Sequence, residues 1–380
     1  MSKVVIVCGS GDYTGGCRMS HLYGRALRAA GWSVSYVIGD RPSDGICLAD
    51  EARRDGFDVL EEKGFFRLFD FRLMRRLSRH LATIRPEFVL STVQCDLKMT
   101  AEAARRAKVP FIVFDQNHHR FYGPWPLRVV KRIACGFELR RAARIICVGA
   151  RVAEQAIGEF KCQRERVVVL PNGIDIGPLL NGAGSADPLP RRNKNLRLLN
   201  VGRLDPQKGQ KFLIEALSLL KDNPCELFLI GAVTNNNPES ELYSKELQRL
   251  VNQFGFNEAV HFLGWRNDIA ALNRACDIYV HSALWEGPPL TISILEAMAL
   301  AKPVIITDCA GFPEGFVNGK HGFVVKAGDA KALADAIRKM IAMSPEQRSE
   351  AGRHAQEFVR ERHDAAVIER QFVNLCEEVL

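Results

Sequence analysis

The chain has 380 residues, of which 47% are hydrophobic and 25% are charged, and its formal net charge is +8. At roughly 150 residues per domain this length favours two domains, and the composition is ordinary for a globular protein and favours neither a disordered nor a fibrous class. No apolar run approaches the roughly 18 residues of a membrane-spanning helix, and the short apolar start leads into a glycine-rich loop rather than a signal-peptide cleavage site, so we expect a cytoplasmic protein.

The first 176 residues alternate short β-branched runs with segments of helical period. Strands are expected at residues 4–7, 34–38, 88–90, 111–114, 145–148 and 167–170, with helices between them. The helix after the first strand carries its apolar residues on one face and ends at Gly31. This alternation is typical of a parallel sheet that is covered by helices on both faces.

Residues 177–195 interrupt this pattern. They contain three prolines and three glycines, which indicates a linker. The alternation then resumes, with strands expected at residues 198–201, 227–230, 260–263, 278–280 and 304–306, and helix from residue 329 to the end. We therefore predict an α/β fold of two doubly wound Rossmann-like domains facing a cleft, residues 1–176 and residues 196–380, with helices at the C-terminus.

The motif VGRLDPQKG, residues 201–209, follows the first strand of the second half. Gly202 permits a tight turn after the strand, and Arg203 and Lys208 place two cations at that turn. Such a pair is suited to a diphosphate, and it would bind more tightly as negative charge develops on a nucleoside diphosphate leaving group. The alternative is a solvated basic turn without a ligand.

A second motif, EGPP, begins at Glu286 and precedes a helix that carries Glu296. A carboxylate in the first turns of a helix can accept hydrogen bonds from the vicinal hydroxyls of a ribose, and the free N–H groups of a helix N-terminus bind phosphate. The alternative for Glu296 is an acid that only complements the helix dipole.

Two loops of the first half follow strands. Residues 9–16 are rich in glycine and suited to an anion, but their spacing does not match the dinucleotide-binding G-x-G-x-x-G. Residues 115–120 read DQNHHR and lie at the carboxyl end of a strand, where a second substrate, the acceptor of a transferred group, would bind. Either Gln116 or His118 is the candidate there, and the alternative is a polar loop histidine without a role in binding.

Taken together, the pieces PNGID, VGRLDPQKG, FLGWRNDI, HSALWEGPPL and LEAMALAKPVI resemble glycosyltransferase family four, the group 1 type of retaining enzymes with the GT-B fold. The resemblance implies that Arg203 and Lys208 hold the donor diphosphate, that Glu296 binds the ribose and that Glu286 lies near the donor sugar. It also implies contacts of the donor with Gly15, Gly16, Gly202, Arg266, Gly287, Leu290 and Thr291, and a histidine such as His118 on the acceptor side.

The spacing of the two glutamates departs from the family pattern. Family members usually have seven residues between them, whereas nine separate Glu286 from Glu296 here. Counting back eight positions from Glu296 reaches Pro288. Either two residues bulge out between the glutamates, or Glu286 is not the equivalent acid.

The sequence predicts no metal site and no cofactor. It contains no D-x-D pair, and its 11 cysteines are scattered without a C-x-x-C, which fits a reducing compartment. The expected function is transfer of a hexose-type sugar from a nucleotide sugar, with UDP as the commonest carrier, to a glycan or lipid-linked acceptor in cell-surface polysaccharide or lipopolysaccharide synthesis. The alternatives are a sugar-nucleotide epimerase of the same fold and a basic nucleic-acid-binding protein, although no nucleic-acid-binding signature is present.

The charge is unevenly distributed along the chain. Residues 1–180 carry 29 Lys and Arg against 19 Asp and Glu, a net of +10, whereas the remaining residues carry a net of −2. Residues 65–85 and 125–144 interleave arginines with large apolar residues. Both segments are typical of basic amphipathic helices that lie on an anionic membrane, and the alternative is a solvated helix face.

Overall fold

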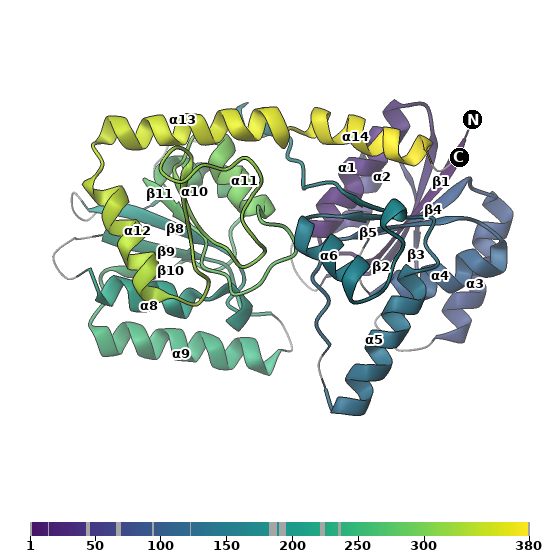
Figure 1. The fold of residues 1–380 in the computed structure, drawn as a ribbon, viewed down its shortest axis with the longest axis horizontal. Coiled ribbons are helices and arrows are strands. Elements are labelled where there is room, and N and C mark those ends of the chain that lie inside the picture. The colour runs from purple at the N-terminus through teal and green to yellow at the C-terminus, as the bar shows by residue number, and fades with distance from the viewer. Residues whose placement is uncertain are drawn as a thin grey trace. The chain divides into compact units, whose positions relative to one another are not determined.

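The computed structural model describes residues 2–13, 15–42, 46–65, 70–92, 95–121, 123–181, 188–189, 195–220, 225–234 and 237–378. The chain divides into two compact units, one formed by Met1–Gly173 with Ala365–Leu380 and the other by Ile174–Asp364 (Figure 1). Each unit holds one parallel sheet with helices around it. The predicted pair of Rossmann-like α/β domains with a helical C-terminus is confirmed.

The first unit is built on a seven-stranded parallel sheet of order β3-β2-β1-β4-β5-β6-β7. Its strands are β1 Lys3–Ser10, β2 Ser33–Asp40, β3 Asp58–Glu61, β4 Phe88–Ser91, β5 Phe111–Asp115, β6 Arg144–Cys147 and β7 Val167–Val169. Its helices are α1 Gly15–Ala29, α2 Leu48–Arg54, α3 Phe71–Ile84, α4 Leu97–Ala107, α5 Trp125–Leu139 and α6 Ala150–Gly158, with a short 3-10 turn at Arg164–Arg166. The edge strand β3 was not predicted, because its sequence DVLE is short and half acidic.

The second unit has a six-stranded parallel sheet of order β10-β9-β8-β11-β12-β13. Its strands are β8 Leu196–Val201, β9 Cys225–Ile230, β10 Val260–Phe262, β11 Ile278–Val280, β12 Val304–Thr307 and β13 Gly322–Val325. Its helices are α7 Ile176–Asn181, α8 Gln210–Ser218, α9 Pro238–Phe254, α10 Ile269–Ala275, α11 Ile292–Ala299, α12 Ala330–Ala342 and α13 Pro345–Arg362, with a 3-10 turn at Pro206–Lys208. The edge strand β13 was also missed.

Apolar side chains cover both faces of the second sheet. Successive side chains of a strand point to opposite faces, and β8 shows the consequence. Leu198 packs in one buried cluster with Leu213 of α8, whereas Leu199 packs in a second cluster with Leu295 of α11. A strand buried on both faces has to be apolar at nearly every position, which is why these strands could be located in the sequence.

The chain boundaries differ from the prediction at two places. The predicted linker at residues 177–195 begins within helix α7, and most of the remainder lies outside the described residues. The C-terminal helix α14 Ala365–Glu377 groups with the first unit rather than with the predicted domain of residues 196–380. Its Phe372 is fully buried and stacks on Tyr23 of α1, with ring centroids 3.9 Å apart. Within the described residues, no helix is long and apolar enough to cross a membrane.

Candidate active site

The predicted motifs of the second unit meet at the centre of its sheet. Strands β8 and β11 are neighbours, and from them the chain winds toward β10 on one side and toward β13 on the other. Loops that follow adjacent strands diverge at such a switch point and leave room for a ligand. The loop after β8 carries Gly202, Arg203 and Lys208, and the loop after β11 carries Glu286. The sheet topology therefore brings the two principal motifs together.

Hydrogen bonds tie these two loops to each other. The Ser282 hydroxyl donates to the carbonyl oxygen of Lys208 at 2.9 Å, and the Leu284 N–H donates to the carbonyl oxygen of Gln207 at 2.7 Å. Gly209 has a φ of +62°, and a Cβ there would lie 2.2 Å from the Ser282 carbonyl oxygen. Only glycine combines this backbone conformation with so close an approach, so the last residue of VGRLDPQKG is required by the packing of the loops.

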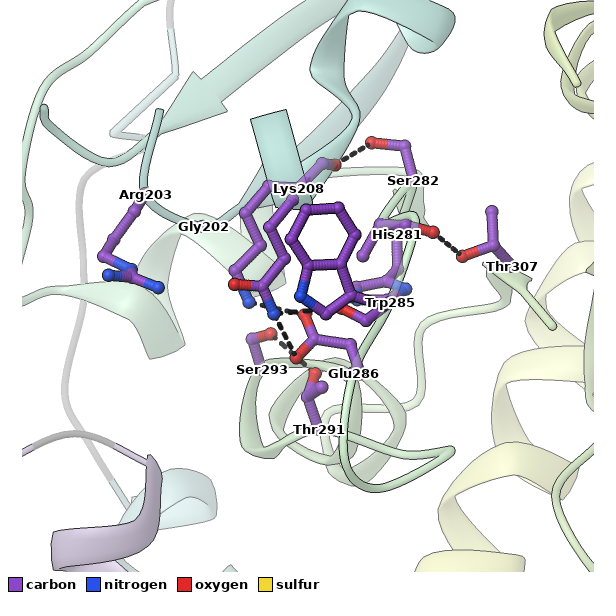
Figure 2. Close-up of polar contacts among 12 residues, drawn as sticks. Gly202, Arg203, Lys208, His281, Ser282, Trp285, Glu286, Thr291, Ser293 and Thr307 are labelled. Carbon is purple, nitrogen blue, oxygen red and sulfur yellow. Dashed lines mark hydrogen bonds and ion pairs between the residues drawn. The ribbon is translucent and has the colours of Figure 1, made fainter. Parts of the chain in front are cut away.

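Lys208 and Glu286 form an ion pair inside this site (Figure 2). Lys208 Nζ lies 2.5 Å from Glu286 Oε1, and the side chains are 20% and 9% exposed. Burial alone would raise the pKa of Glu286, but the charges of Lys208 and His281 lower that pKa to about 2. Glu286 is therefore ionised at neutral pH.

The neighbours of the ion pair are polar side chains. Gln207 Nε2 donates to the Trp285 carbonyl oxygen at 2.9 Å and fixes the chain next to Glu286. His281 Nε2 lies 3.6 Å from Glu286 Oε1. Both ring nitrogens of His281 are buried, and neither has a hydrogen-bond partner among the described residues. Its Nε2 nevertheless lies within ion-pair distance of Glu286 and helps to lower the pKa of that carboxyl, so His281 belongs to the polar surroundings of the pair.

Arg203 is placed differently from Lys208. Figure 2 shows its side chain extending from the same loop but away from the ion pair. The side chain is exposed, whereas its backbone carbonyl accepts a hydrogen bond from Gln210 Nε2 at 2.8 Å. The two predicted cations thus share a loop, and of the two only Lys208 pairs with Glu286.

The helix α11 carries the second predicted acid. Glu296 lies in its second turn and is 6% exposed. Thr291 is the N-cap residue of α11, and its hydroxyl lies 3.1 Å from the hydroxyl of Ser293. Gly287 and Leu290, which precede the helix, are buried. These residues lead directly from the ion pair to the start of α11.

Arg266 lies in the loop after β10. It is bound by Asp268 through two hydrogen bonds of 2.8 and 2.5 Å. The same loop is joined to the centre of the sheet, because the Gly231 N–H donates to the Gly264 carbonyl oxygen at 2.8 Å. The structure thus places Arg266 at the carboxyl edge of the sheet, with its guanidinium held by an acid of its own loop.

The glycine-rich loop of the first unit also lies at a switch point, between β1 and β4. The Gly9 N–H donates to Oδ2 of the buried Asp96 at 2.9 Å, which ties the loop to the chain beyond β4. A Cβ on Gly16 would lie 2.1 Å from Oε1 of Gln116, whose Nε2 donates to the Thr92 carbonyl oxygen at 2.5 Å. Gly15 is exposed, and nothing lies near its Cβ position.

Of the two candidates in the DQNHHR loop, the structure brings Gln116 rather than His118 against the glycine-rich loop. His118 is half-buried, and burial lowers its pKa. The next residue, His119, is buried, with Nε2 2.9 Å from Asp115 Oδ2. Burial would lower the pKa of His119, but Asp115 raises it well above the usual value. His119 therefore holds the loop onto β5.

Sequence reasoning missed three polar residues of these sites. Asp96, Gln207 and His281 were not singled out, although Gln207 and His281 lie within quoted motifs. The signal was their position directly after a strand or within a turn, which marks polar residues for the carboxyl edge of a sheet. Among the described residues, no group of three or more His, Cys, Asp or Glu side chains could hold a metal ion, and metal independence stays a prediction.

Two successive parallel-sheet units with polar loops at their switch points fit the GT-B class of fold. Comparison with known families gives the particular one. Residues 185–358 match the family Glycosyl transferases group 1, and residues 14–177 match Glycosyltransferase Family 4. The chain therefore belongs to family 4 of the glycosyltransferases, as the motifs predicted.

The similar proteins include two bacterial transferases. The UDP-Gal:alpha-D-GlcNAc-diphosphoundecaprenol alpha-1,3-galactosyltransferase of Escherichia coli is 28% identical over 62% of this chain and 61% of its own length. The N,N'-diacetylbacillosaminyl-diphospho-undecaprenol alpha-1,3-N-acetylgalactosaminyltransferase of Campylobacter jejuni is 30% identical over 48% of this chain and 45% of its own length. The chain thus spans about half the length of these relatives.

Among solved structures, Anabaena HepE in complex with UDP-glucose superimposes with a TM-score of 0.81. The sequences are 22% identical, and the match covers all of both chains. This likeness confirms the fold.

Proposed function

We propose that this protein is a retaining glycosyltransferase that moves a hexose-type sugar from a nucleotide sugar, with UDP as the carrier, to a lipid-linked or glycan acceptor. The observation that carries the proposal is the Lys208–Glu286 pair at the switch point of the second sheet. The names of the Escherichia coli and Campylobacter jejuni relatives support an acceptor on a polyprenyl diphosphate. The proposed role is in cell-surface polysaccharide or lipopolysaccharide synthesis. Such an enzyme would work peripherally at a membrane.

The diphosphate end of the site would use Lys208 and Arg203. Lys208 is held by Glu286 at 2.5 Å, so its ammonium group is positioned before the donor arrives. Arg203 is exposed, so its guanidinium can reach a phosphate from solvent. Charge on the leaving diphosphate grows in the transition state, and preorganised cations stabilise that charge most strongly at that point. No step in this scheme needs a metal ion.

The sugar end would use Glu286 and His281. With a pKa near 2, Glu286 is an acceptor for sugar hydroxyls and cannot serve as a general acid at neutral pH. Its charge is compensated by Lys208, which weakens it as a nucleophile. We therefore favour a front-face reaction, in which the leaving phosphate oxygen takes the proton of the acceptor hydroxyl. A covalent glycosyl-enzyme adduct, trapped with a fluorinated donor and seen by intact mass, would contradict this mechanism.

The test of the donor site is a thermal shift panel of nucleotide sugars. We expect one donor to stabilise the protein, and we expect Lys208→Ala to abolish that stabilisation. Lys211→Ala is the matched control, because Lys211 lies three residues further on and pairs with Glu246 on the surface instead. If no nucleotide sugar raises the melting temperature of the wild type, the proposed function is wrong.

Transfer activity separates this proposal from the epimerase alternative. A transferase consumes the donor in proportion to the acceptor, whereas an epimerase of this fold acts on the nucleotide sugar without any acceptor. Assays of UDP release with and without an undecaprenyl-diphosphate-linked sugar, in buffer containing EDTA, measure both acceptor dependence and metal independence. Release that does not respond to any acceptor would favour the epimerase.

A further inference from the structure

Two cysteines lie side by side next to the glycine-rich loop of the first unit. Cys8 is near the end of strand β1, and Cys17 is in the first turn of helix α1. Their Sγ atoms are 3.3 Å apart, and the residues are 0% and 4% exposed. The S–S bond of a disulfide is about 2.0 Å long, so these sulfurs would have to approach by about 1.3 Å to form one.

Both thiols lie close to the same backbone carbonyl of that loop. Cys8 Sγ is 3.2 Å and Cys17 Sγ is 3.6 Å from the carbonyl oxygen of Ser10. A thiol can donate a hydrogen bond to such an oxygen, whereas a disulfide has no S–H group. Oxidation would therefore remove every S–H donor of the pair from the Ser10 carbonyl, and a backbone acceptor that is shielded from water needs another partner. The redox state of the two sulfurs is thus coupled to the backbone of the loop.

The loop that the pair supports lies where a sheet of this kind binds anionic ligands. It follows β1 at the switch point between β1 and β4 and leads into the N-terminus of α1. Its start is anchored, because the Gly9 N–H donates to Asp96 Oδ2 and the Gly11 N–H donates to the Asp40 carbonyl oxygen, both at 2.9 Å. An S–S bond would draw the first turn of α1 toward β1 while these anchors hold the start of the loop. The beginning of α1 would therefore change its position at the ligand edge of the sheet.

The two thiols differ in acidity. The hydrogen bond between them lowers the pKa of Cys8, although burial acts in the opposite direction, and it raises the pKa of Cys17 well above the usual value. Cys8 is therefore the sulfur that ionises first, and the thiolate is the form that reacts with an oxidant. Gly15, two residues before Cys17, is exposed, and nothing lies near its Cβ position. Because helix ends open locally at low cost, a small oxidant can reach the sulfurs through the first turn of α1.

We propose that Cys8 and Cys17 form an oxidisable dithiol site, which a hydroperoxide converts to a disulfide that weakens the binding of the nucleotide sugar. The Cys8 thiolate attacks one oxygen of the peroxide, so that an S–O bond forms, the O–O bond breaks and hydroxide leaves. The Cys17 sulfur then attacks the Cys8 sulfur, and the S–S bond forms while the hydroxyl group leaves with the Cys17 proton as water.

The step is balanced and reversible. The two thiols lose two electrons, and the peroxide accepts them and ends as two molecules of water, one of which takes the proton that Cys8 released. A thiol reductant restores both S–H groups by exchange. The effect on nucleotide-sugar binding rests on the proposed function, whereas the formation of the disulfide does not.

The test is peptide mapping of the full-length protein after treatment with hydrogen peroxide and alkylation of the remaining thiols. Both cysteines fall in one tryptic peptide, residues 4–18. We expect this peptide to escape alkylation and to be lighter than its reduced form by two hydrogen atoms. Calorimetry with the donor selected by the thermal shift panel should then show about tenfold weaker binding, the loss of one hydrogen bond to a charged phosphate. Dithiothreitol should reverse both changes.

Single-cysteine variants separate this pair from the other thiols. Cys17→Ser keeps a donor for the Ser10 carbonyl but cannot form the disulfide, and Cys8→Ala removes the other sulfur. Both variants should keep their affinity for the nucleotide sugar after peroxide treatment. Cys95→Ser is the matched control, because Cys95 is half-buried against the same loop, where its Sγ would lie 2.8 Å from a Cβ on Gly9. This variant should form the disulfide and lose affinity like the wild type.

Three results would overturn the proposal. The first is a peptide of residues 4–18 that stays fully alkylated in the peroxide-treated wild type, and the second is a disulfide that leaves the affinity unchanged. The third is a loss of affinity in Cys17→Ser equal to that of the wild type, which would place the sensitive thiol elsewhere, for example at Cys309, whose pKa is raised by burial and by the charge of Glu286. A failure of the proposed function looks different, because the reduced wild type would then bind no nucleotide sugar, while the peptide still decides whether the dithiol site exists.

Discussion

Removal of the Lys208 ammonium group tests the ion pair that organises the candidate active site. Lys208→Met keeps an unbranched side chain of similar length and removes the charge. The Glu286 carboxylate then stays nearly buried. Of the two side chains that lower its pKa, Lys208 and His281, only His281 remains. Breaking a buried pair from one side costs more than the pair itself contributes, because the remaining charge keeps its desolvation penalty.

The magnitude follows from the pKa of Glu286, which folding lowers from 4.5 to about 2. One pKa unit corresponds to about 1.4 kcal/mol, so ionised Glu286 contributes about 3 kcal/mol to the free energy of unfolding at neutral pH. Burial acts in the opposite direction, and the charge of Lys208 is the largest of the effects that lower the pKa. For a unit the size of Ile174–Asp364, a loss of about 3 kcal/mol lowers the melting temperature by about 6–12 °C.

The pH dependence of the free energy of unfolding tests independently whether ionised Glu286 stabilises the protein. A carboxylate whose pKa is lowered by folding stabilises the protein above its unfolded pKa, and this stabilisation is lost as the pH falls toward the folded pKa. The difference between the wild type and Lys208→Met should therefore be largest near neutral pH and should shrink between about pH 4.5 and about pH 2. Urea unfolding, followed by circular dichroism at several pH values, measures the difference.

The control is Lys211→Met, which removes a lysine from its ion pair with Glu246, in which both side chains are exposed. Exposed pairs contribute on the order of 0–1 kcal/mol, so this variant should melt close to the wild type. The reasoning is refuted if Lys208→Met melts within about 1 °C of the wild type near neutral pH, or if its deficit is the same at neutral and acidic pH.

Three further outcomes are expected. Gly209→Ala should destabilise the second unit by more than 1 kcal/mol, as seen by urea unfolding, because its Cβ would meet the Ser282 carbonyl oxygen at 2.2 Å and its φ is +62°. Asp115→Asn should lower the pKa of His119, followed by the NMR signal of its ring during titration, since Asp115 is the group that raises it most. Glu296→Gln should weaken UDP binding about tenfold or more in calorimetry while leaving the fold intact, because a carboxylate that accepts ribose hydroxyls contributes about 1.5–3 kcal/mol; unchanged affinity would remove Glu296 from the site.

The central strands of both sheets could be predicted because they are buried on two faces. A strand such as Phe88–Ser91 is buried at every position, so its sequence is a nearly continuous apolar run that is easy to recognise. The edge strands β3 and β13 face solvent on one side and are four residues long, so their patterns resemble loops. The assignment of α14 to the first unit depends on the stacking of Phe372 on Tyr23. An amphipathic pattern shows that one face of a helix is buried, but it does not show which other element covers that face.

The candidate site was predictable where the chemistry is local and not where it depends on contacts across the chain. Arg203 and Lys208 could be selected from one motif, because both lie in a turn after a strand. The partner of Lys208 is 78 residues away, and only the neighbouring position of β8 and β11 brings Glu286 to it. The buried His281 follows the same strand β11. Its position after a strand was its only signal, and that signal is weak because a single histidine after a strand is common in any fold.

The spacing between Glu286 and Glu296 shows why contacts are a better guide than counting. Glu296 is fixed by its place in α11, and Glu286 is fixed by its contact with Lys208. Between them, the chain from Gly287 to Leu290 forms bends and contains two consecutive prolines, which cannot donate backbone hydrogen bonds to a helix or a sheet. Extra residues in such a segment shift neither end, so two additional positions can be accommodated without moving either carboxylate. Counting back from the helix reaches a proline, whereas the ion pair places Glu286 beside Lys208, and the role of Glu286 at the donor sugar stays a prediction.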